Sequence, residues 1–216
     1  MNELLGPLTA LPLIAILRGL VPENAEAVGW ALFEAGFRII EVPLNSPRPF
    51  ESITALAKAF NGQALIGAGT VIDRGDVVRV LEAGAKLLVM PHSDASIIAA
   101  AKACRLYCVP GVATPSEGFA ALAAGADALK LFPAETMPPT VVKAWRAVFP
   151  PETLLIPVGG ITPEKIADYR GAGAAALGLG SALFTPGLSI EQIRQRADRF
   201  VEACRSSVPN LHVAAS

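Results

Sequence analysis

Eight short apolar runs, each separated from the next by a longer stretch, constrain the fold of this chain more than any other feature. The runs cover residues 13–17, 39–44, 65–70, 87–91, 106–110, 128–132, 154–158 and 175–179. Between them, apolar residues recur at helical spacing, as at Val28, Leu32 and Ala35. Strands that alternate with helices form parallel sheets, and eight such units with starts 19–26 residues apart predict an α/β fold, the closed (β/α)8 or TIM barrel.

The junctions between the predicted helices and strands support this count. Four of them read EAGFRIIEV, EAGAKLLVM, AAGADALKL and GAGAAALGL, and each has a glycine where a left-handed helix cap is expected: Gly36, Gly84, Gly125 and Gly173. Pro22, Pro115 and Pro163 mark helix starts, the last two behind the N-cap candidates Thr114 and Thr162.

No linker divides the chain, so we expect one barrel domain over residues 1–216. Residues 1–10 are predicted to form a short helix at the bottom of the barrel. The last helix is predicted over residues 190–204, with apolar residues at positions 190, 193, 197, 200, 201 and 204, and residues 206–216 are predicted to be a loose tail. A length of 216 residues is typical of a single (β/α)8 domain.

Composition excludes several classes of protein. The chain is 52% hydrophobic and 17% charged, with a formal net charge of −1, and no segment has 18 consecutive apolar residues. These values argue against disorder, membrane spans and a nucleic-acid partner. The N-terminus lacks a basic region and a cleavage site, so we expect a cytoplasmic protein. Two histidines and three cysteines in unsuitable spacing argue against a metal site or a Ser-His-Asp triad.

Lys130 is the one charge in the run ALKLFPA, which is predicted to be a buried strand. Burial of an ammonium group is costly, so such a lysine loses its proton more easily, and a neutral amine is a nucleophile that forms a Schiff base with a carbonyl carbon. Two other interpretations remain open here. Lys130 could extend out of the strand end to water, or it could form a structural ion pair.

Glu41 interrupts the apolar run IIEVPL in the same way. The second and sixth strands face each other across a barrel, so Glu41 and Lys130 are expected to point into one cavity. A carboxyl group with a raised pKa beside an amine suits proton transfer, although a structural ion pair would fit the same geometry. Other polar residues follow the strand ends, where barrel active sites lie: Arg18, Asn45, Thr70, His92 and Thr114.

Glycines after the seventh and eighth predicted strands suggest a phosphate site. Barrel phosphate sites form from these two loops, where backbone N–H groups approach the anion. The segment VGGIT contains Gly159 and Gly160, and LGLGSALF contains Gly180 and Ser181. The combination predicts a phosphorylated substrate.

Seven segments together resemble the 2-keto-3-deoxy-6-phosphosugar-acid aldolases, class I enzymes with 6-phosphogluconate and 6-phosphogalactonate members. They are ILRG at 16–19, EVPLNSP at 41–47, LIGAGTV at 65–71, PG at 110–111, ALKLFPAE at 128–135, VGGI at 158–161 and LGLGS at 177–181.

The resemblance implies cleavage of a phosphorylated 2-keto-3-deoxy sugar acid to pyruvate and glyceraldehyde 3-phosphate, without a cofactor or metal. Lys130 matches the Schiff-base lysine and Glu41 the acid/base glutamate. Arg18 and Thr70 match residues that hold the carboxylate end of the substrate. The phosphate cradle is matched by Gly159, Gly160, Gly180 and Ser181. Family members are commonly trimers, so the resemblance also implies a homo-oligomer.

The two family substrates differ only in configuration at C4. Gluconate-type enzymes carry EVTLRT, whereas this chain has Pro43 and Asn45 in EVPLNSP, which is similar to the galactonate type. We therefore expect 2-dehydro-3-deoxy-6-phosphogalactonate as the substrate, with the gluconate epimer, or use of both, as the alternative. Asn45 and Pro157 are candidate specificity residues. A synthase or isomerase on a phosphate-binding barrel and a non-catalytic sugar-phosphate sensor are the remaining alternatives.

Overall fold

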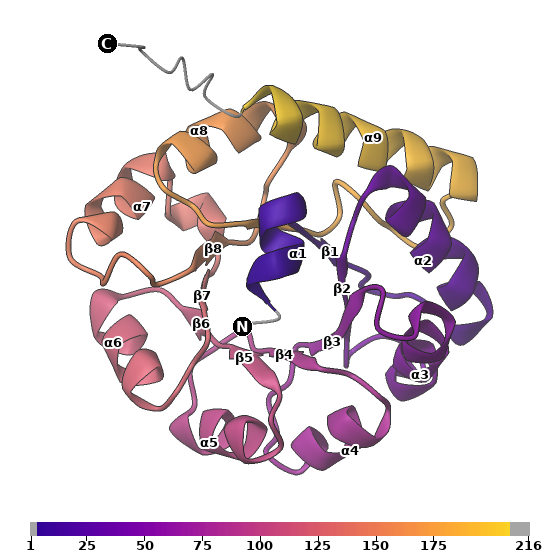
Figure 1. Cartoon of the computed structure of the whole chain (residues 1–216), viewed down its shortest axis with the longest axis horizontal. Helices are drawn as coiled ribbons and strands as arrows, with labels where there is room; N and C mark the ends of the chain where they lie inside the picture. Colours follow the sequence, from indigo (N-terminus) through magenta and orange to yellow (C-terminus); the bar gives the residue numbers. More distant parts are fainter. Residues whose placement is uncertain (1–3, 208–216) are drawn as a thin grey trace.

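The parallel strands curl into a ring with helices around its outside (Figure 1). The structure is a computed structural model that describes residues 4–207. Its strands are β1 (Leu13–Ile16), β2 (Ile39–Pro43), β3 (Leu65–Gly69), β4 (Leu87–Val89), β5 (Tyr107–Val109), β6 (Gly111–Val112), β7 (Leu129–Leu131), β8 (Leu155–Pro157) and β9 (Leu177–Leu179). The α/β class and the parallel sheet predicted from the alternation of strand and helix are confirmed.

The strands belong to two hydrogen-bonded sheets. One has the order β5-β4-β3-β2-β1-β9 and the other β6-β7-β8. The fifth predicted run, residues 106–110, contains β5 alone, and β6 follows beyond its end as a strand that was not predicted, because Pro110 has no N–H to donate and interrupts the ladder. Hydrogen bonds continue across both junctions: Asp127 N–H, two residues before β7, donates to the carbonyl of Cys108 in β5 over 3.0 Å, and Val158 forms a parallel bridge with Gly178.

All helices but the first surround the ring in chain order, and the first lies across the middle of the ring (Figure 1). The helices are α1 (Leu5–Ala10), α2 (Pro22–Ala35), α3 (Pro49–Phe60), α4 (Asp76–Glu82), α5 (Ala95–Ala103), α6 (Pro115–Ala123), α7 (Pro139–Arg146), α8 (Ile166–Gly171) and α9 (Ile190–Ser206), with 3-10 turns η1 (Ala134–Thr136) and η2 (Pro163–Lys165). Within residues 4–207, none of these helices is long and apolar enough to cross a membrane.

Most of the predicted helix boundaries are confirmed. The four cap glycines have positive φ angles, from 86° at Gly84 to 119° at Gly36, and Thr114 forms a capping box with Glu117. The prediction for Thr162 was wrong in part, because the segment after it begins as the 3-10 turn η2, closed by a bond from Lys165 N–H to the Thr162 carbonyl over 3.0 Å.

The last helix, α9, begins at Ile190 as predicted and continues to Ser206, two residues beyond the predicted end. Ile190 does not belong to its buried face, because this first helical residue is 38% exposed. Of the predicted tail, residues 208–216 lie outside the described residues.

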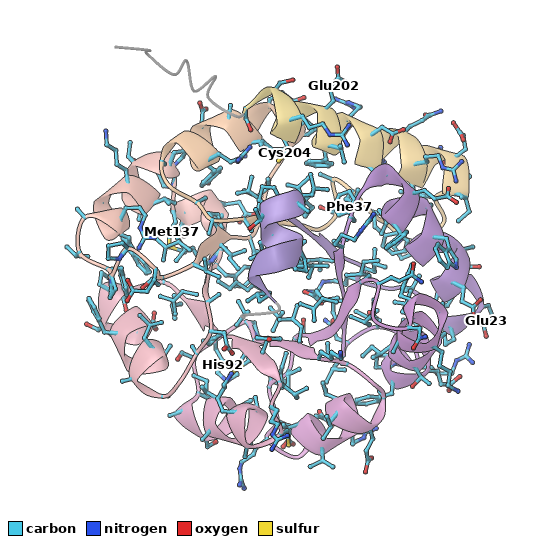
Figure 2. All side chains as sticks on the ribbon, viewed as in Figure 1. Glu23, Phe37, His92, Met137, Glu202 and Cys204 are labelled. Carbon is cyan, nitrogen blue, oxygen red and sulfur yellow. The ribbon has the colours of Figure 1, made fainter. Side chains whose placement is uncertain are left out.

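The core has two layers, because side chains of a strand alternate between the faces of the sheet. The outer layer lies between the ring and the helices, and Figure 2 shows two of its members, Phe37 and Met137, on opposite sides of the ring. The inner layer fills the ring. Leu4, just before α1, and Leu8, within it, pack there with Ile39 and Leu65, the first residues of β2 and β3. The helix predicted within residues 1–10 therefore covers the N-terminal ends of the strands.

Candidate active site

Strand alternation places Lys130 and Glu41 inside the ring. Ala128 and Ile39, two residues before each of them, belong to the inner layer, whereas Leu129 and Ile40 belong to the outer layer. The side chains of Lys130 and Glu41 therefore point inward from β7 and β2. Lys130 is 5% exposed and Glu41 is 2% exposed. This burial rules out the interpretation in which Lys130 extends to bulk water.

Gly69 makes room for the Glu41 carboxyl group. A Cβ atom at Gly69 would lie 1.8 Å from Glu41 Oε2, so no larger residue fits at this position of β3 without displacing the carboxyl group. Among the described residues, Glu41 Oε2 has no hydrogen-bond partner. Burial raises the pKa of Glu41 to about 7, although the positive charges of Lys130 and Arg18 act to lower it.

Burial lowers the pKa of Lys130, and the charge of Arg18 lowers it further, while Glu41 acts in the opposite direction. In residues 4–207 the Lys130 ammonium forms no ion pair within 4.0 Å, which removes the simple structural ion pair. Its Nζ lies 4.6 Å from the centre of the Phe132 ring. An amine and a carboxyl group with pKa values shifted toward neutrality are suited to exchange protons.

Arg18, which follows β1, forms hydrogen bonds with polar residues that follow β2 and β3. Its guanidinium donates one hydrogen bond to Asn45 Oδ1 and another, over 3.3 Å, to Thr70 Oγ1. Thr70 has a φ angle of 54°, which is strained for a β-branched residue. Such strain is common at functional sites, where surrounding contacts hold it in place. The sequence predictions for Arg18, Asn45 and Thr70 therefore fall on one cluster.

A cavity of about 830 Å³ connects the amine to the glycine loops. Six of the predicted site residues line it: Arg18, Lys130, Gly159, Gly160, Gly180 and Ser181. Gly159 and Gly160 have φ angles of 120° and 58°, a region that L side chains rarely adopt, so glycine is required by the backbone here. The cavity is large enough for a small phosphorylated metabolite.

Six residues singled out from the sequence do not line this cavity. Glu41 interacts electrostatically with Lys130, and Asn45 and Thr70 are bonded to Arg18, whereas three others lie apart. His92 is exposed in the loop after β4 (Figure 2), and the hydroxyl group of Thr114 caps α6. Pro157 is buried next to Ile156 and Val158, both of which belong to the inner layer, so alternation directs Pro157 outward. None of the three lines the cavity.

Sequence reasoning missed Glu135, which also lines the cavity. Its carboxyl group lies against the glycine pair, since a Cβ atom at Gly159 would be 2.2 Å from Glu135 Oε2. The turn that carries Glu135 is fixed by Tyr169, whose single hydroxyl proton is shared between the Ala134 and Met137 carbonyls over 3.0 and 3.2 Å. The segment ALKLFPAE contains Glu135, but an acidic residue after a strand carries no distinctive pattern.

Comparison with known proteins finds relatives that match most of the chain. The family model of KDPG and KHG aldolases matches residues 6–200. A probable 2-dehydro-3-deoxy-6-phosphogalactonate aldolase of Rhizobium meliloti is 47% identical, over 86% of this chain and 88% of the relative. The 2-dehydro-3-deoxy-6-phosphogalactonate aldolase of Escherichia coli is 44% identical, over 93% and 98% respectively.

Solved structures show the same likeness. A structure described as native KDPGal superposes with a TM-score of 0.90 at 44% identity, over 91% of this chain and 96% of the other. A KDPG aldolase from Legionella pneumophila, with pyruvate captured as a covalent carbinolamine intermediate, gives a TM-score of 0.74 at 29% identity, over 93% and 95%.

Proposed function

Because the chain belongs to the KDPG and KHG aldolase family, we propose that it is a class I aldolase that cleaves 2-dehydro-3-deoxy-6-phosphogalactonate. The products are pyruvate and D-glyceraldehyde 3-phosphate. The protein is thus a carbon–carbon lyase. The single observation that carries the proposal is the buried amine of Lys130, which lines the cavity and has a lowered pKa.

Lys130 is the nucleophile in this proposal. Its neutral amine attacks the C2 keto carbon to form a carbinolamine, and loss of water gives a protonated imine. The C3–C4 bond then breaks, its electron pair moves into the imine to form an enamine, and the C4 hydroxyl proton leaves as the aldehyde forms. Protonation at C3 and hydrolysis by the released equivalent of water yield pyruvate and free Lys130. The sequence balances without an oxidant, reductant or further reactant.

Glu41 is the acid and base of these steps. A carboxyl group with a pKa of about 7 can release and accept protons at neutral pH, as the loss of water and the protonation at C3 require. Its pKa is supported by full burial and by the lack of a hydrogen-bond partner for Oε2 among residues 4–207. Glu41 acts on the substrate directly or through a water.

Arg18 and Thr70 are proposed to hold the carboxylate end of the substrate. The Arg18 guanidinium lines the cavity beside Lys130, and its bonds to Asn45 and Thr70 fix its direction. Asn45 is a candidate specificity residue because a change at this position would release Arg18. Neither Asn45 nor Pro157 lines the cavity, but Asn45 accepts a hydrogen bond from Arg18, which does, so Asn45 is the better candidate of the two.

The phosphate is proposed to bind at the other side of the cavity. Gly159 and Gly160 allow the backbone to approach an anion, and Gly180 and Ser181 follow β9 at the same rim. The Ser181 hydroxyl group adds a side-chain donor. This arrangement fits the loops at which barrel enzymes bind phosphate.

We further infer that the two sheets form one closed (β/α)8 barrel in a single domain, because hydrogen bonds continue across both junctions. A homo-oligomer, a trimer by resemblance, is also proposed. Ile72, Val78 and Leu81, in and just before α4, are 43–64% exposed, as expected at a subunit interface. Light scattering on the purified protein tests the trimer. The cytoplasmic location stays a prediction.

A paired assay tests the proposed function. Pyruvate release is followed with 2-dehydro-3-deoxy-6-phosphogalactonate and with its gluconate epimer under identical conditions, with Lys130→Met as the enzyme blank. We expect the galactonate compound to give the higher kcat/KM. A preference for the gluconate epimer would overturn the substrate assignment but keep the aldolase, whereas no release from either compound would overturn the aldolase itself.

A further inference from the structure

Two cationic side chains that do not line the cavity donate hydrogen bonds to the glycine loops. Lys165, in η2, donates a hydrogen bond from Nζ to the Gly160 carbonyl over 2.7 Å. Arg196, in α9, donates from Nη1 to the Ser181 carbonyl over 3.3 Å. In each of the two loops, a cationic side chain therefore holds a backbone carbonyl, although Lys165 and Arg196 come from different elements. Neither cation lines the cavity.

The position of each carbonyl fixes the direction of the next N–H group. A trans peptide is planar, so its C=O and N–H bonds point to opposite sides, and both peptides here are trans. When Lys165 holds the Gly160 carbonyl, the N–H of Ile161 points the other way. Arg196 has the same effect on the N–H of Ala182.

Both of these N–H groups belong to residues of the cavity wall. Ile161 and Ala182 line the cavity together with Gly159 and Ser181. Neither N–H donates to a backbone carbonyl of the described chain, so both are free to bind an anion. Polar backbone groups in a cavity wall need a partner, and a phosphate oxygen would supply one.

The two cations also balance a negative charge at this place. The carboxyl group of Glu135 lies against Gly159 and Gly160, where it would repel a phosphate dianion. Glu164, the acidic residue next to Lys165, is paired with Arg199 over 3.4 Å. Lys165 and Arg196 are therefore the positive charges directed to the two loops by a hydrogen bond.

We propose that Lys165 and Arg196 are positioning residues of the phosphate site, which orient the N–H groups of Ile161 and Ala182 toward a bound phosphate. The inference deepens the proposed function and rests on it for the identity of the phosphorylated substrate. The cations act through the backbone, so their loss weakens phosphate binding without touching the chemistry at Lys130.

The test compares Lys165→Met, Arg196→Met and the double variant with wild type. We expect each single variant to weaken binding of inorganic phosphate, measured by calorimetry, about 5-fold, and to raise KM for the phosphorylated substrate by the same factor. The kcat should stay within about twofold of wild type, because a positioning hydrogen bond at the phosphate affects binding more than chemistry. Lys165→Arg keeps a donor and should restore most of the affinity.

Arg199→Met is the matched control, because it removes a positive charge near the same loops without a bond to either carbonyl. It should change phosphate affinity less than twofold. An equal loss in Arg199→Met and Arg196→Met, or unchanged phosphate affinity in Lys165→Met, would overturn the inference. Calorimetry with phosphate needs no turnover. It therefore tests this inference separately from the aldolase assignment, which fails if the wild type releases no pyruvate.

Discussion

The two ends of the cavity differ in the groups that they present: buried ionisable side chains at one end and backbone groups at the other. At the amine end, the ionisable side chains of Lys130 and Glu41 are almost fully buried, and burial shifts both pKa values toward neutrality. At the other end, where phosphate is proposed to bind, glycines present their backbone to the cavity, and Lys165 and Arg196 do not line it. Chemistry requires groups that change charge easily, whereas binding of a dianion requires fixed dipoles that do not titrate.

Loss of the amine should have the largest effect. Lys130→Met should lower kcat about 10⁴-fold or more, because no other described lysine lines the cavity to form the imine. Steady-state assays and circular dichroism measure this. Lys102→Met is the matched control, because Lys102 pairs with Asp127 over 2.6 Å on the outside of the ring. Retained turnover in Lys130→Met would remove the imine mechanism.

Loss of the Glu41 carboxyl group should have the second-largest effect on turnover. Glu41→Gln keeps the shape of the side chain and removes proton transfer, so kcat should fall about 10²- to 10⁴-fold. The wild-type profile of kcat/KM against pH should bend near pH 7, the value to which burial raises the pKa of Glu41. The variant should lack this bend. A bend at the same pH in Glu41→Gln would assign it to another group.

The substitution Glu41→Gln should also stabilise the folded state at alkaline pH. The folded protein keeps the Glu41 proton up to a pKa of about 7, whereas the unfolded chain loses it near 4.5, so wild-type stability falls as pH rises through this window. The shift corresponds to about 3 kcal/mol. Urea titrations should therefore show Glu41→Gln more stable than wild type by about that amount at pH 8, with little difference at pH 4.5. A pH-independent difference would contradict this.

A change at the phosphate end should have a smaller and selective effect. In Gly159→Ala the new Cβ meets Glu135 Oε2 at 2.2 Å in a strained backbone, so the loop must shift. KM for the phosphorylated substrate should rise about 10-fold, while trapping of pyruvate on Lys130 stays unchanged. Gly171→Ala, which has open space and no positive φ, controls for folding. Equal loss of both readouts would show that the two ends are not independent.

The sequence was informative where a residue broke a pattern. Lys130 and Glu41 stand out as charges in apolar runs, and their inward direction follows from strand alternation. The cap glycines were predictable for the same reason, since only glycine adopts their φ angles at little cost.

Residues that act through loop geometry gave no such signal. Glu135, Lys165 and Arg196 are charged residues outside any distinctive sequence pattern, and only the folded chain brings them to the glycine loops. Strand β6, directly after Pro110, was also missed, because a proline reads as the end of a strand until the hydrogen bonds beyond it are traced.

Trapping with borohydride tests the central claim most directly. Wild-type protein is incubated with pyruvate and sodium borohydride over a range of pH, and its peptides are analysed by mass spectrometry, with Lys130→Met in parallel. The account predicts a reduced pyruvoyl adduct on the peptide that contains Lys130, already formed at neutral pH because burial lowers the pKa of this amine. No adduct, or an adduct that persists in Lys130→Met, would contradict it.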